Sequence, residues 1–266
     1  MNYQKVGVSM FLTINDISKD YMNQQTVQTV LSSINVTIKE GEFVSILGPS
    51  GCGKSTLLSI VAGLTKPTTG EIRLKDSVIK GPGKDRGMVF QQAALFPWMT
   101  VEENVLFAIR DIKDKKDQLE KAHHFLKMVQ LSSSLHLHPH ELSGGMQQRV
   151  SIARALAMNP TVLLMDEPFG ALDEQTRMLL QKELEKIWLE TKKTVLFVTH
   201  SIYESIKLSD RILVMGTRPG EIIADITVDI ERPRLRTDEQ VTRLESEISN
   251  LLEKEIEKVM YEELGR

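Results

Sequence analysis

The sequence predicts an α/β protein built on a mixed sheet, with an antiparallel β-subdomain at its N-terminus and an α-helical subdomain inserted into the core. Three observations lead to this prediction. Residues 11–47 alternate between apolar and polar side chains, as strands with one buried face do. Residues 101–130 instead repeat apolar side chains at helical spacing. Short apolar runs at 161–165 and 194–199 flank a helical segment, 174–190, and this alternation favours parallel strands joined by crossover helices.

The N-terminal region has the pattern of paired strands. Ile34, Val36 and Ile38 fall on one face of a predicted strand, so we expect an antiparallel sheet here. Residues 70–75 and 86–91 are predicted as further short strands.

A helical subdomain is expected at about residues 92–158. Within residues 101–130, apolar side chains recur three or four positions apart, which is the spacing of one helix face. These side chains are Leu119, Ala122, Phe125, Leu126 and Val129.

The tail from Asp238 onward has apolar side chains at near-helical spacing among glutamates and lysines, namely Val241, Leu244, Ile248, Leu251, Ile256 and Val259. This pattern predicts one amphipathic C-terminal helix over about residues 238–266. We expect its apolar face to dock against the chain's own domain, and a contact with a partner is the alternative. No long linker divides the sequence, so residues 1–266 are expected to form a single domain.

Composition excludes several classes of protein. The chain has 266 residues, 41% of them hydrophobic, which is enough to form a real core. Its longest apolar runs fall short of the roughly 18 residues that a membrane-spanning helix needs. Residues 1–10 lack a secretory pattern, and a single cysteine, Cys52, fits a reducing cytoplasm. A formal net charge of −3 disfavours binding to nucleic acid.

The stretch Gly48–Thr56 (GPSGCGKST) fits the phosphate-binding pattern G-x-x-x-x-G-K-[ST]. The pattern alone would arise by accident in roughly one chain of this length in a hundred. Its context is more specific, because an apolar strand precedes it at 42–47 and an apolar helix follows from residue 54 to 62. The sequence therefore predicts a P-loop NTPase core. The alternative, a glycine-rich turn before a core helix, needs neither the lysine nor the two hydroxyls.

The residue types in this loop suit the binding of a nucleotide. Its glycines let the backbone amides and the helix N-terminus approach phosphate oxygens closely. Lys54 can reach the β and γ phosphates, Ser55 can offer its hydroxyl to Mg²⁺, and Thr56 adds a donor. Cys52 could be a nucleophile, but we interpret it as a small filler. The residues expected to bind ATP here are Gly48, Pro49, Ser50, Gly51, Cys52, Gly53, Lys54, Ser55 and Thr56.

Two carboxylates end the apolar run Val162–Met165. A buried strand would not carry them without a use. We expect Asp166 to hold Mg²⁺ and Glu167 to orient the attacking water or accept its proton. The alternative is a carboxylate pair that caps the turn before Pro168.

A further stretch, Leu142–Arg149 (LSGGMQQR), opens a predicted helix with a serine and two glycines. The hydroxyl of Ser143 and the free amides around Gly144 and Gly145 are suited to a second anion site.

From about residue 9 to residue 229 the chain resembles the ATP-binding subunit of an ABC transporter, with each motif in the family's order. The resemblance implies that Gln91 senses Mg²⁺ and the γ phosphate and that Asp173 lies in a loop crossing between two subunits. It implies that His200 is the switch histidine on the γ phosphate and that Tyr21 stacks on adenine. Taken singly, each residue has an ordinary alternative, such as a polar strand end or a packed aromatic.

The resemblance also implies the working assembly. ATP and Mg²⁺ are the expected cofactors, and a second copy of the chain completes each site by facing its Ser143 site to the other copy's nucleotide. Met146 stands where the family usually has glutamine, and we expect only local packing to differ there.

The implied partners are membrane permease subunits that dock in a groove near Gln91, where Ala93–Met99 is a dense apolar run. A substrate-binding protein would feed these subunits. The chain is then expected peripherally at the cytoplasmic face of the inner membrane. Asp166–Asp173 and Arg218–Gly220 look most like the nitrate, sulfonate and taurine importers, so uptake of such a solute is the expected function.

The alternative is a soluble ABC-type ATPase that acts on translation or DNA. Translation factors of this type usually carry two such domains, and DNA-structure proteins insert long coiled coils. Here about 90 residues without sustained heptads separate the phosphate loop from Leu142. A non-hydrolysing scaffold would be expected to lack Glu167, which is present.

Overall fold

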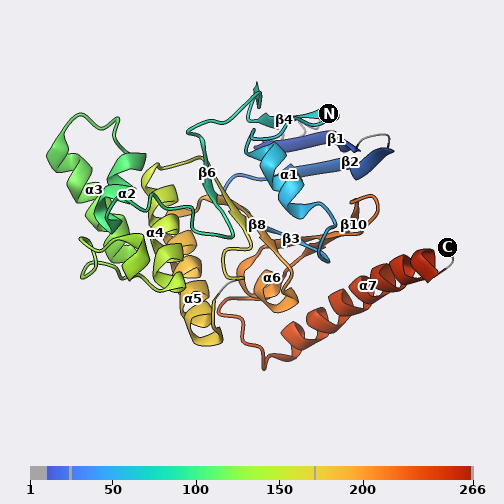
Figure 1. Cartoon of the computed structure of the whole chain (residues 1–266). Coiled ribbons are helices and arrows are strands. Elements are labelled where there is room, and N and C mark those ends of the chain that lie inside the picture. The colour runs from blue at the N-terminus through green and yellow to red at the C-terminus, as the bar shows by residue number, and fades with distance from the viewer. Residues whose placement is uncertain (1–10, 24–25, 171, 265–266) are drawn as a thin grey trace, which may run out of the picture.

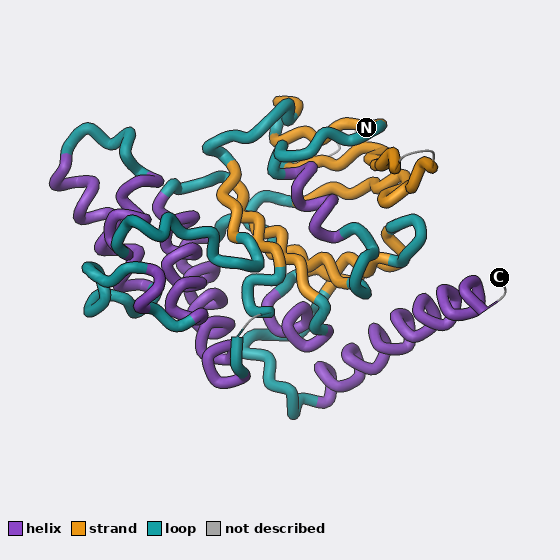
Figure 2. Tube along the Cα trace, in the orientation of Figure 1, coloured by secondary structure: helices purple, strands orange, loops and turns teal. Residues whose placement is uncertain are grey.

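The computed structural model describes residues 11–23, 26–170 and 172–264. The expectations for residues 1–10, Ala171 and residues 265–266 therefore lie outside the described part of the chain. Two β-sheets form its centre, helices gather at one side, and a long helix at the C-terminal end extends past the sheets on the other (Figure 1). The same layers are visible when strands and helices are coloured separately (Figure 2).

The N-terminal sheet is antiparallel, as predicted. Its four strands are ordered β2-β1-β4-β5. Ile34, Val36 and Ile38 are buried on one face of the second strand, which confirms the alternation seen in the sequence. The strands are β1 (Leu12–Asn23), β2 (Thr26–Ile38), β4 (Thr69–Leu74) and β5 (Ser77–Val78).

The larger sheet has the order β10-β9-β3-β8-β7-β6. Its strands are parallel except for β10 at the edge, so the predicted parallel pairing of the two apolar runs is confirmed. The central strands are buried along their whole length because both faces are covered. The strands are β3 (Phe43–Leu47), β6 (Arg86–Val89), β7 (Val162–Asp166), β8 (Thr194–Thr199), β9 (Arg211–Met215) and β10 (Ile222–Thr227).

Helix α1 (Lys54–Val61) lies between the two sheets (Figure 1). Leu57 and Leu58 share one apolar cluster with Ile14 of the small sheet and with Val44 and Leu164 of the large one. This cluster fixes where α1 begins, and therefore fixes the loop before it.

The region between β6 and β7 is helical and lies beside the large sheet (Figure 1). The prediction of one helical stretch over 101–130 is wrong in detail, because the helix is interrupted between residues 109 and 114. Asp114 starts a new helix by accepting hydrogen bonds from the amides of Lys116 and Asp117. Leu119 is 39% exposed, so it does not belong to the buried face. The helices are α2 (Val101–Ala108), α3 (Lys115–Met128), the 3₁₀ turn η1 (Pro139–Glu141) and α4 (Gly144–Ala157).

Three helices complete the fold, namely α5 (Glu174–Thr191), α6 (Ile202–Leu208) and α7 (Glu239–Leu264). Val241 and Ile248 of α7 are buried against Ile206 of α6 and Ile212 of β9, which confirms docking on its own domain. Further along α7, Ile256 is 48% exposed, so the predicted apolar face is not buried along the whole helix. Among the described residues, no helix combines the length and the apolar character that a bilayer-crossing segment needs.

Candidate functional site

The candidate site lies at the carboxyl ends of three neighbouring parallel strands. The phosphate loop follows β3, Asp166 ends β7 with Glu167 directly after it, and His200 follows β8. These strands are adjacent in the sheet, in the order β3-β8-β7. Loops at the carboxyl ends of parallel strands meet at one edge, which is where ligands bind in such sheets. The sheet order therefore gathers residues that are far apart in the sequence.

The backbone of the phosphate loop needs its glycines. Gly51 and Gly53 have φ values of 81° and 97°, a region that L-residues with side chains rarely adopt. Gly53 precedes α1, whose first amides receive no side-chain cap. A helix N-terminus with free amides attracts anions. The loop is therefore built to accept phosphate groups.

Lys54 is the cation of this loop and is only 5% exposed. Its ammonium donates hydrogen bonds of 2.8 Å to the carbonyls of Gly48 and Pro49. A buried ammonium needs such partners. Phosphate oxygens can replace these carbonyls, because they are stronger acceptors for a charged donor.

Cys52 is a packing residue in this geometry. Its side chain is buried, and burial raises the pKa of the thiol, so the thiolate is disfavoured. A Cβ on Gly48 would lie 2.8 Å from the Cys52 sulfur and 2.8 Å from the carbonyl oxygen of Met215. The nucleophilic alternative for Cys52 is therefore not supported by its surroundings.

Ser55 and Asp166 meet across the site, where the Ser55 hydroxyl donates a 2.9 Å hydrogen bond to the Asp166 carboxylate. Burial raises the pKa of Asp166, although the bond from Ser55 opposes this shift. A carboxylate with a hydroxyl beside it is an oxygen donor set that suits Mg²⁺. Within the described residues there is no cluster of three or more acidic, histidine or cysteine ligands, so phosphate and water oxygens would have to complete the coordination.

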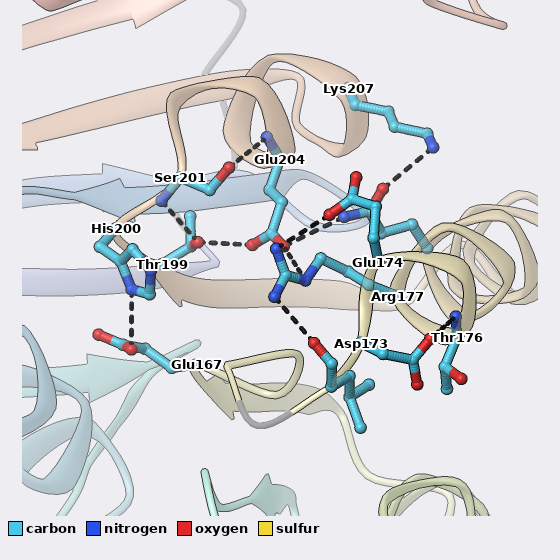
Figure 3. A network of polar contacts seen from close by, with 12 residues as sticks. Glu167, Asp173, Glu174, Thr176, Arg177, Thr199, His200, Ser201, Glu204 and Lys207 are labelled. Carbon is cyan, nitrogen blue, oxygen red and sulfur yellow. Dashed lines mark hydrogen bonds and ion pairs between the residues drawn. The ribbon is translucent and has the colours of Figure 1, made fainter. Parts of the chain in front are cut away.

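Glu167 and His200 form the second pair. The Glu167 carboxylate lies 3.0 Å from Nδ1 of His200 (Figure 3). Glu167 has a φ of 41°, which is uncommon for a side-chain-bearing residue and is held by a 3.0 Å bond from its amide to the Val198 carbonyl. A Cβ on Gly170 would lie 3.5 Å from the Gln91 amide nitrogen and 3.7 Å from the Glu167 carboxylate. Gln91, Glu167 and His200 are thus gathered together.

The serine–glycine stretch starts α4, where Ser143 caps the helix by accepting a 3.3 Å bond from the Met146 amide. Ser143 and Gly144 are exposed. Gly145 is buried, and a Cβ there would lie 2.5 Å from the Thr176 side chain on α5. Met146 itself is partly buried against the helical core, where it acts in packing.

Asp173 caps α5 by accepting a 3.0 Å bond from the Thr176 amide, and this bond lowers the pKa of Asp173. Since Thr176 also touches Gly145, the starts of α4 and α5 are neighbours. Within one chain the starts of α4 and α5 pack against each other, and the predicted anion sites at Ser143 and at the phosphate loop lie on different elements.

Tyr21 belongs to the N-terminal sheet. It is on β1 opposite Gln28, is 43% exposed, and has the Lys19 ammonium 4.9 Å from its ring centre. The phosphate loop approaches β2 nearby, since a Cβ on Gly53 would lie 2.6 Å from Leu31, and Leu31 pairs with Lys19, two residues before Tyr21.

Sequence reasoning missed a support of the phosphate loop at Gly220. A Cβ there would lie 2.1 Å from the Cys52 carbonyl oxygen, and the Gly220 amide donates a 2.9 Å bond to Val30. In the sequence, Arg218–Gly220 points only to a resemblance with one group of importers. A glycine before a strand was the available signal, but the sequence does not show what approaches it.

Comparison with known proteins agrees with this geometry. A family described as "ABC transporter" matches residues 31–170. The chain is 47% identical to a bicarbonate transport ATP-binding protein of Synechocystis, covering 85% of this chain and 82% of the relative. It is 46% identical to an aliphatic sulfonates import ATP-binding protein of Bacillus thuringiensis, covering 90% and 94%. It is 42% identical to a nitrate import ATP-binding protein of Synechocystis, covering 91% and 95%.

A solved structure also resembles it. This is a dimeric ATP-binding cassette in a post-hydrolysis state, bound to ADP and Pi, with a TM-score of 0.74 and 36% identity over 83% of this chain and 100% of that one. The fold, the loops gathered at the strand ends and these similarities all indicate the same family. The chain therefore belongs to the ABC transporter family, as an ATP-binding subunit that hydrolyses ATP.

Proposed function

We propose that two copies of this chain power a membrane importer by binding and hydrolysing two ATP molecules between them. The observation that carries this proposal is the meeting of Ser55 with Asp166, and of Glu167 with His200, at strand ends beside the phosphate loop. A cation-binding pair and an acid–base pair at one anion site are the parts that phosphoryl transfer to water requires.

In this proposal, Lys54 and the amides of the phosphate loop bind the β and γ phosphates. Ser55 and Asp166 would hold Mg²⁺, which when bound neutralises phosphate charge. Glu167 accepts a proton from the attacking water as the water oxygen bonds to the γ phosphorus. The bond from that phosphorus to the β–γ bridging oxygen breaks, giving ADP and inorganic phosphate. His200 and Gln91 orient the γ phosphate and the water.

A second copy would complete each site. Ser143 and Gly144 are exposed at the start of α4, on a surface separate from the chain's own phosphate loop. The related cassette with ADP and Pi is dimeric, which supports a head-to-tail pair in which each serine–glycine site faces the partner's nucleotide. Asp173 would lie at the same interface.

The surface that would meet the membrane subunits is a groove beside the helical region. It has a volume of about 370 Å³, and its apolar lining includes Phe90, Phe96 and Phe107. Trp98 stands close to it, with its ring centre 5.6 Å from that of Phe96 and the two rings tilted by 46°, and its side chain is 70% exposed. Exposed aromatic residues at one place mark a contact surface. This surface supports peripheral attachment at the cytoplasmic face of the membrane.

The transported solute is proposed from the relatives alone. Their names give bicarbonate, aliphatic sulfonates and nitrate, so a small oxyanion, with taurine as a sulfonate example, is the proposed cargo class. A substrate-binding protein would deliver it.

Affinity capture from detergent-solubilised native membranes tests the proposed assembly. We expect a multi-span membrane protein to co-purify with the tagged chain in stoichiometric amount. Its companion binding protein, assayed with bicarbonate, nitrate and taurine, would then identify the solute. Recovery of ribosomes or DNA instead would support the soluble-ATPase alternative.

Replacing Glu167 with glutamine tests the catalytic assignment. The amide cannot take the proton, so turnover should fall at least about 100-fold, as general-base losses do. ATP should still bind and should trap a dimer, visible by light scattering. Rapid hydrolysis by Glu167→Gln would remove Glu167 from the role of base.

A further inference from the structure

A buried carboxylate, Glu204, lies beside the segment that carries His200 (Figure 3). It is 6% exposed, and the proposed chemistry does not use it. Burying a charged side chain is costly unless it is bonded on several sides. The partners of Glu204 therefore indicate what it does.

One oxygen of Glu204 holds the switch segment. The Thr199 hydroxyl donates a 2.6 Å bond to Glu204 and accepts a 3.0 Å bond from the Ser201 amide. The amide of Glu204 in turn donates to the Ser201 hydroxyl at 3.3 Å. The residues on both sides of His200 are thus fixed by this one carboxylate.

The other oxygen of Glu204 faces α5. Gln181 donates a 3.1 Å bond to it, and the Arg177 Nε lies 3.9 Å away. The Arg177 Nη2 donates a 2.9 Å bond to the Leu172 carbonyl, directly before Asp173 (Figure 3). Arg177 therefore lies between Glu204 and the loop that the proposed dimer places at its interface.

The link between Arg177 and Glu204 is not closed. The Arg177 Nε is buried and has no hydrogen-bond partner among the described residues, although the carboxylate is within ion-pair distance. A cleft of about 450 Å³ borders Arg177, Glu204 and His200, so the guanidinium has room to move. A small shift of the Leu172–Asp173 loop would let this N–H bond Glu204.

We propose that Arg177 and Glu204 are positioning residues that couple the Leu172–Asp173 loop to His200. When a second copy presses on that loop, Arg177 closes on Glu204, and Glu204 then fixes Thr199 and Ser201 so that His200 and Glu167 are aligned for hydrolysis. The coupling makes turnover depend on dimer formation. This inference rests on the proposed head-to-tail dimer.

The test is a double-mutant cycle on ATP turnover by the full chain, using Glu204→Gln and Arg177→Gln. Glutamine keeps much of each side chain's size but removes the charge. We expect each single change to lower kcat about tenfold while KM for ATP stays within about twofold, because neither residue touches the nucleotide. The double variant should lose no more than either single one, because both act through one link.

Lys182→Gln is the matched control, since it removes an exposed basic residue from the same helix. It should leave kcat unchanged. Thr199→Val and Thr199→Ser form a second, gentler pair in case the charged variants fold poorly. The valine variant lacks the hydroxyl that Glu204 holds and should lose kcat, and the serine variant should restore it.

The outcome distinguishes failure of the proposed coupling from failure of the proposed function. If the unaltered chain hydrolyses ATP but the kcat losses of Arg177→Gln and Glu204→Gln multiply, or are absent, the coupling is wrong and the proposed function stands. The same holds if Thr199→Val keeps full kcat. If the unaltered chain neither hydrolyses ATP nor forms an ATP-dependent dimer, the proposed function itself fails.

Discussion

At the scale of single residues, the site consists of charged groups whose present partners can be exchanged for a ligand. The Lys54 ammonium is held by two backbone carbonyls, and the Asp166 carboxylate is held by one hydroxyl. Lys54 is buried and Asp166 is partly buried, and the partners of both groups are weaker than a phosphate or a metal ion would be. This balance leads to two predictions.

Replacing Lys54 with alanine should weaken ATP binding itself. Hydrogen bonds to charged groups are worth about 1.5–3 kcal/mol, so the dissociation constant should rise about 10- to 100-fold. Titration with a fluorescent ATP analogue measures this. ADP affinity should fall less, because part of the contact is to the γ phosphate. Unchanged affinity for both nucleotides would mean that the phosphate loop is wrongly assigned.

Replacing Asp166 with asparagine should raise thermal stability while abolishing Mg²⁺-dependent turnover. Burial raises the pKa of Asp166 in the folded chain, so folding favours the protonated form. This favourable contribution is present at low pH and is lost as pH rises from the unfolded pKa of about 4 through the folded pKa. The asparagine variant should therefore melt higher at pH 7, and the difference should narrow as pH falls.

Asp111→Asn is the control for this calorimetry, because the pKa of Asp111 is shifted in the opposite direction. The hydrogen bond from Lys84 lowers the pKa of this exposed carboxylate, so its charge is favourable and its loss should bring no gain in melting temperature. Equal responses of the two variants would show that burial of Asp166 is not the cause.

At the scale of elements, the sequence predicts the helices and strands that local patterns determine, and it misses those that depend on tertiary packing. The strand at 194–199 and the helix from 174 are found at or within one residue of their expected ends, because apolar runs and the Asp173 cap are local signals. The break between α2 and α3 was missed because apolar side chains at helical spacing lie on both sides of it, although residues 113–118 are all polar and Asp114 caps the new start. The short helix α6 and the strand β9 were not predicted.

Gly220 shows how a loop far along the sequence can position the phosphate loop. A Cβ there would meet the Cys52 carbonyl at 2.1 Å, so Gly220→Ala should push the phosphate loop out of position. We expect a loss of about 1–3 kcal/mol in the free energy of unfolding, as overpacking gives, together with a higher KM for ATP. Gly81→Ala is the control, since a Cβ there meets nothing within 4 Å. Wild-type KM in Gly220→Ala would exclude the supporting role.

At the scale of the whole molecule, the sequence motifs fall on two surfaces. The phosphate loop, Asp166, Glu167, Gln91 and His200 gather at the carboxyl ends of the strands, and this followed from the strand–loop pattern. Ser143 lies on another surface, which agrees with the expectation that its ligand belongs to a second copy. Tyr21 could not be placed from sequence, because the path of the β1–β2 hairpin relative to the loop depends on tertiary packing.

The proposed contact with membrane subunits makes a prediction that separates two exposed aromatic residues. Trp98 lies beside the groove and is 70% exposed, and Tyr261 lies on α7 and is 76% exposed. Neither supports the core, so alanine at either position should leave the melting temperature and ATP affinity unchanged. An aromatic side chain at the centre of an interface commonly contributes 2 kcal/mol or more, so Trp98→Ala should weaken capture of the permease about 30-fold.

Tyr261→Ala should capture the permease as the unaltered chain does, and quantitative pull-down with the purified permease measures both variants. The reverse result, with loss at Tyr261 and none at Trp98, would overturn the groove as the docking surface. It would place the membrane contact on α7, whose later turns carry the exposed side chains Ile256 and Tyr261. Because both variants remove one exposed aromatic ring, a difference between them reports position on the molecule and not a general loss of apolar surface.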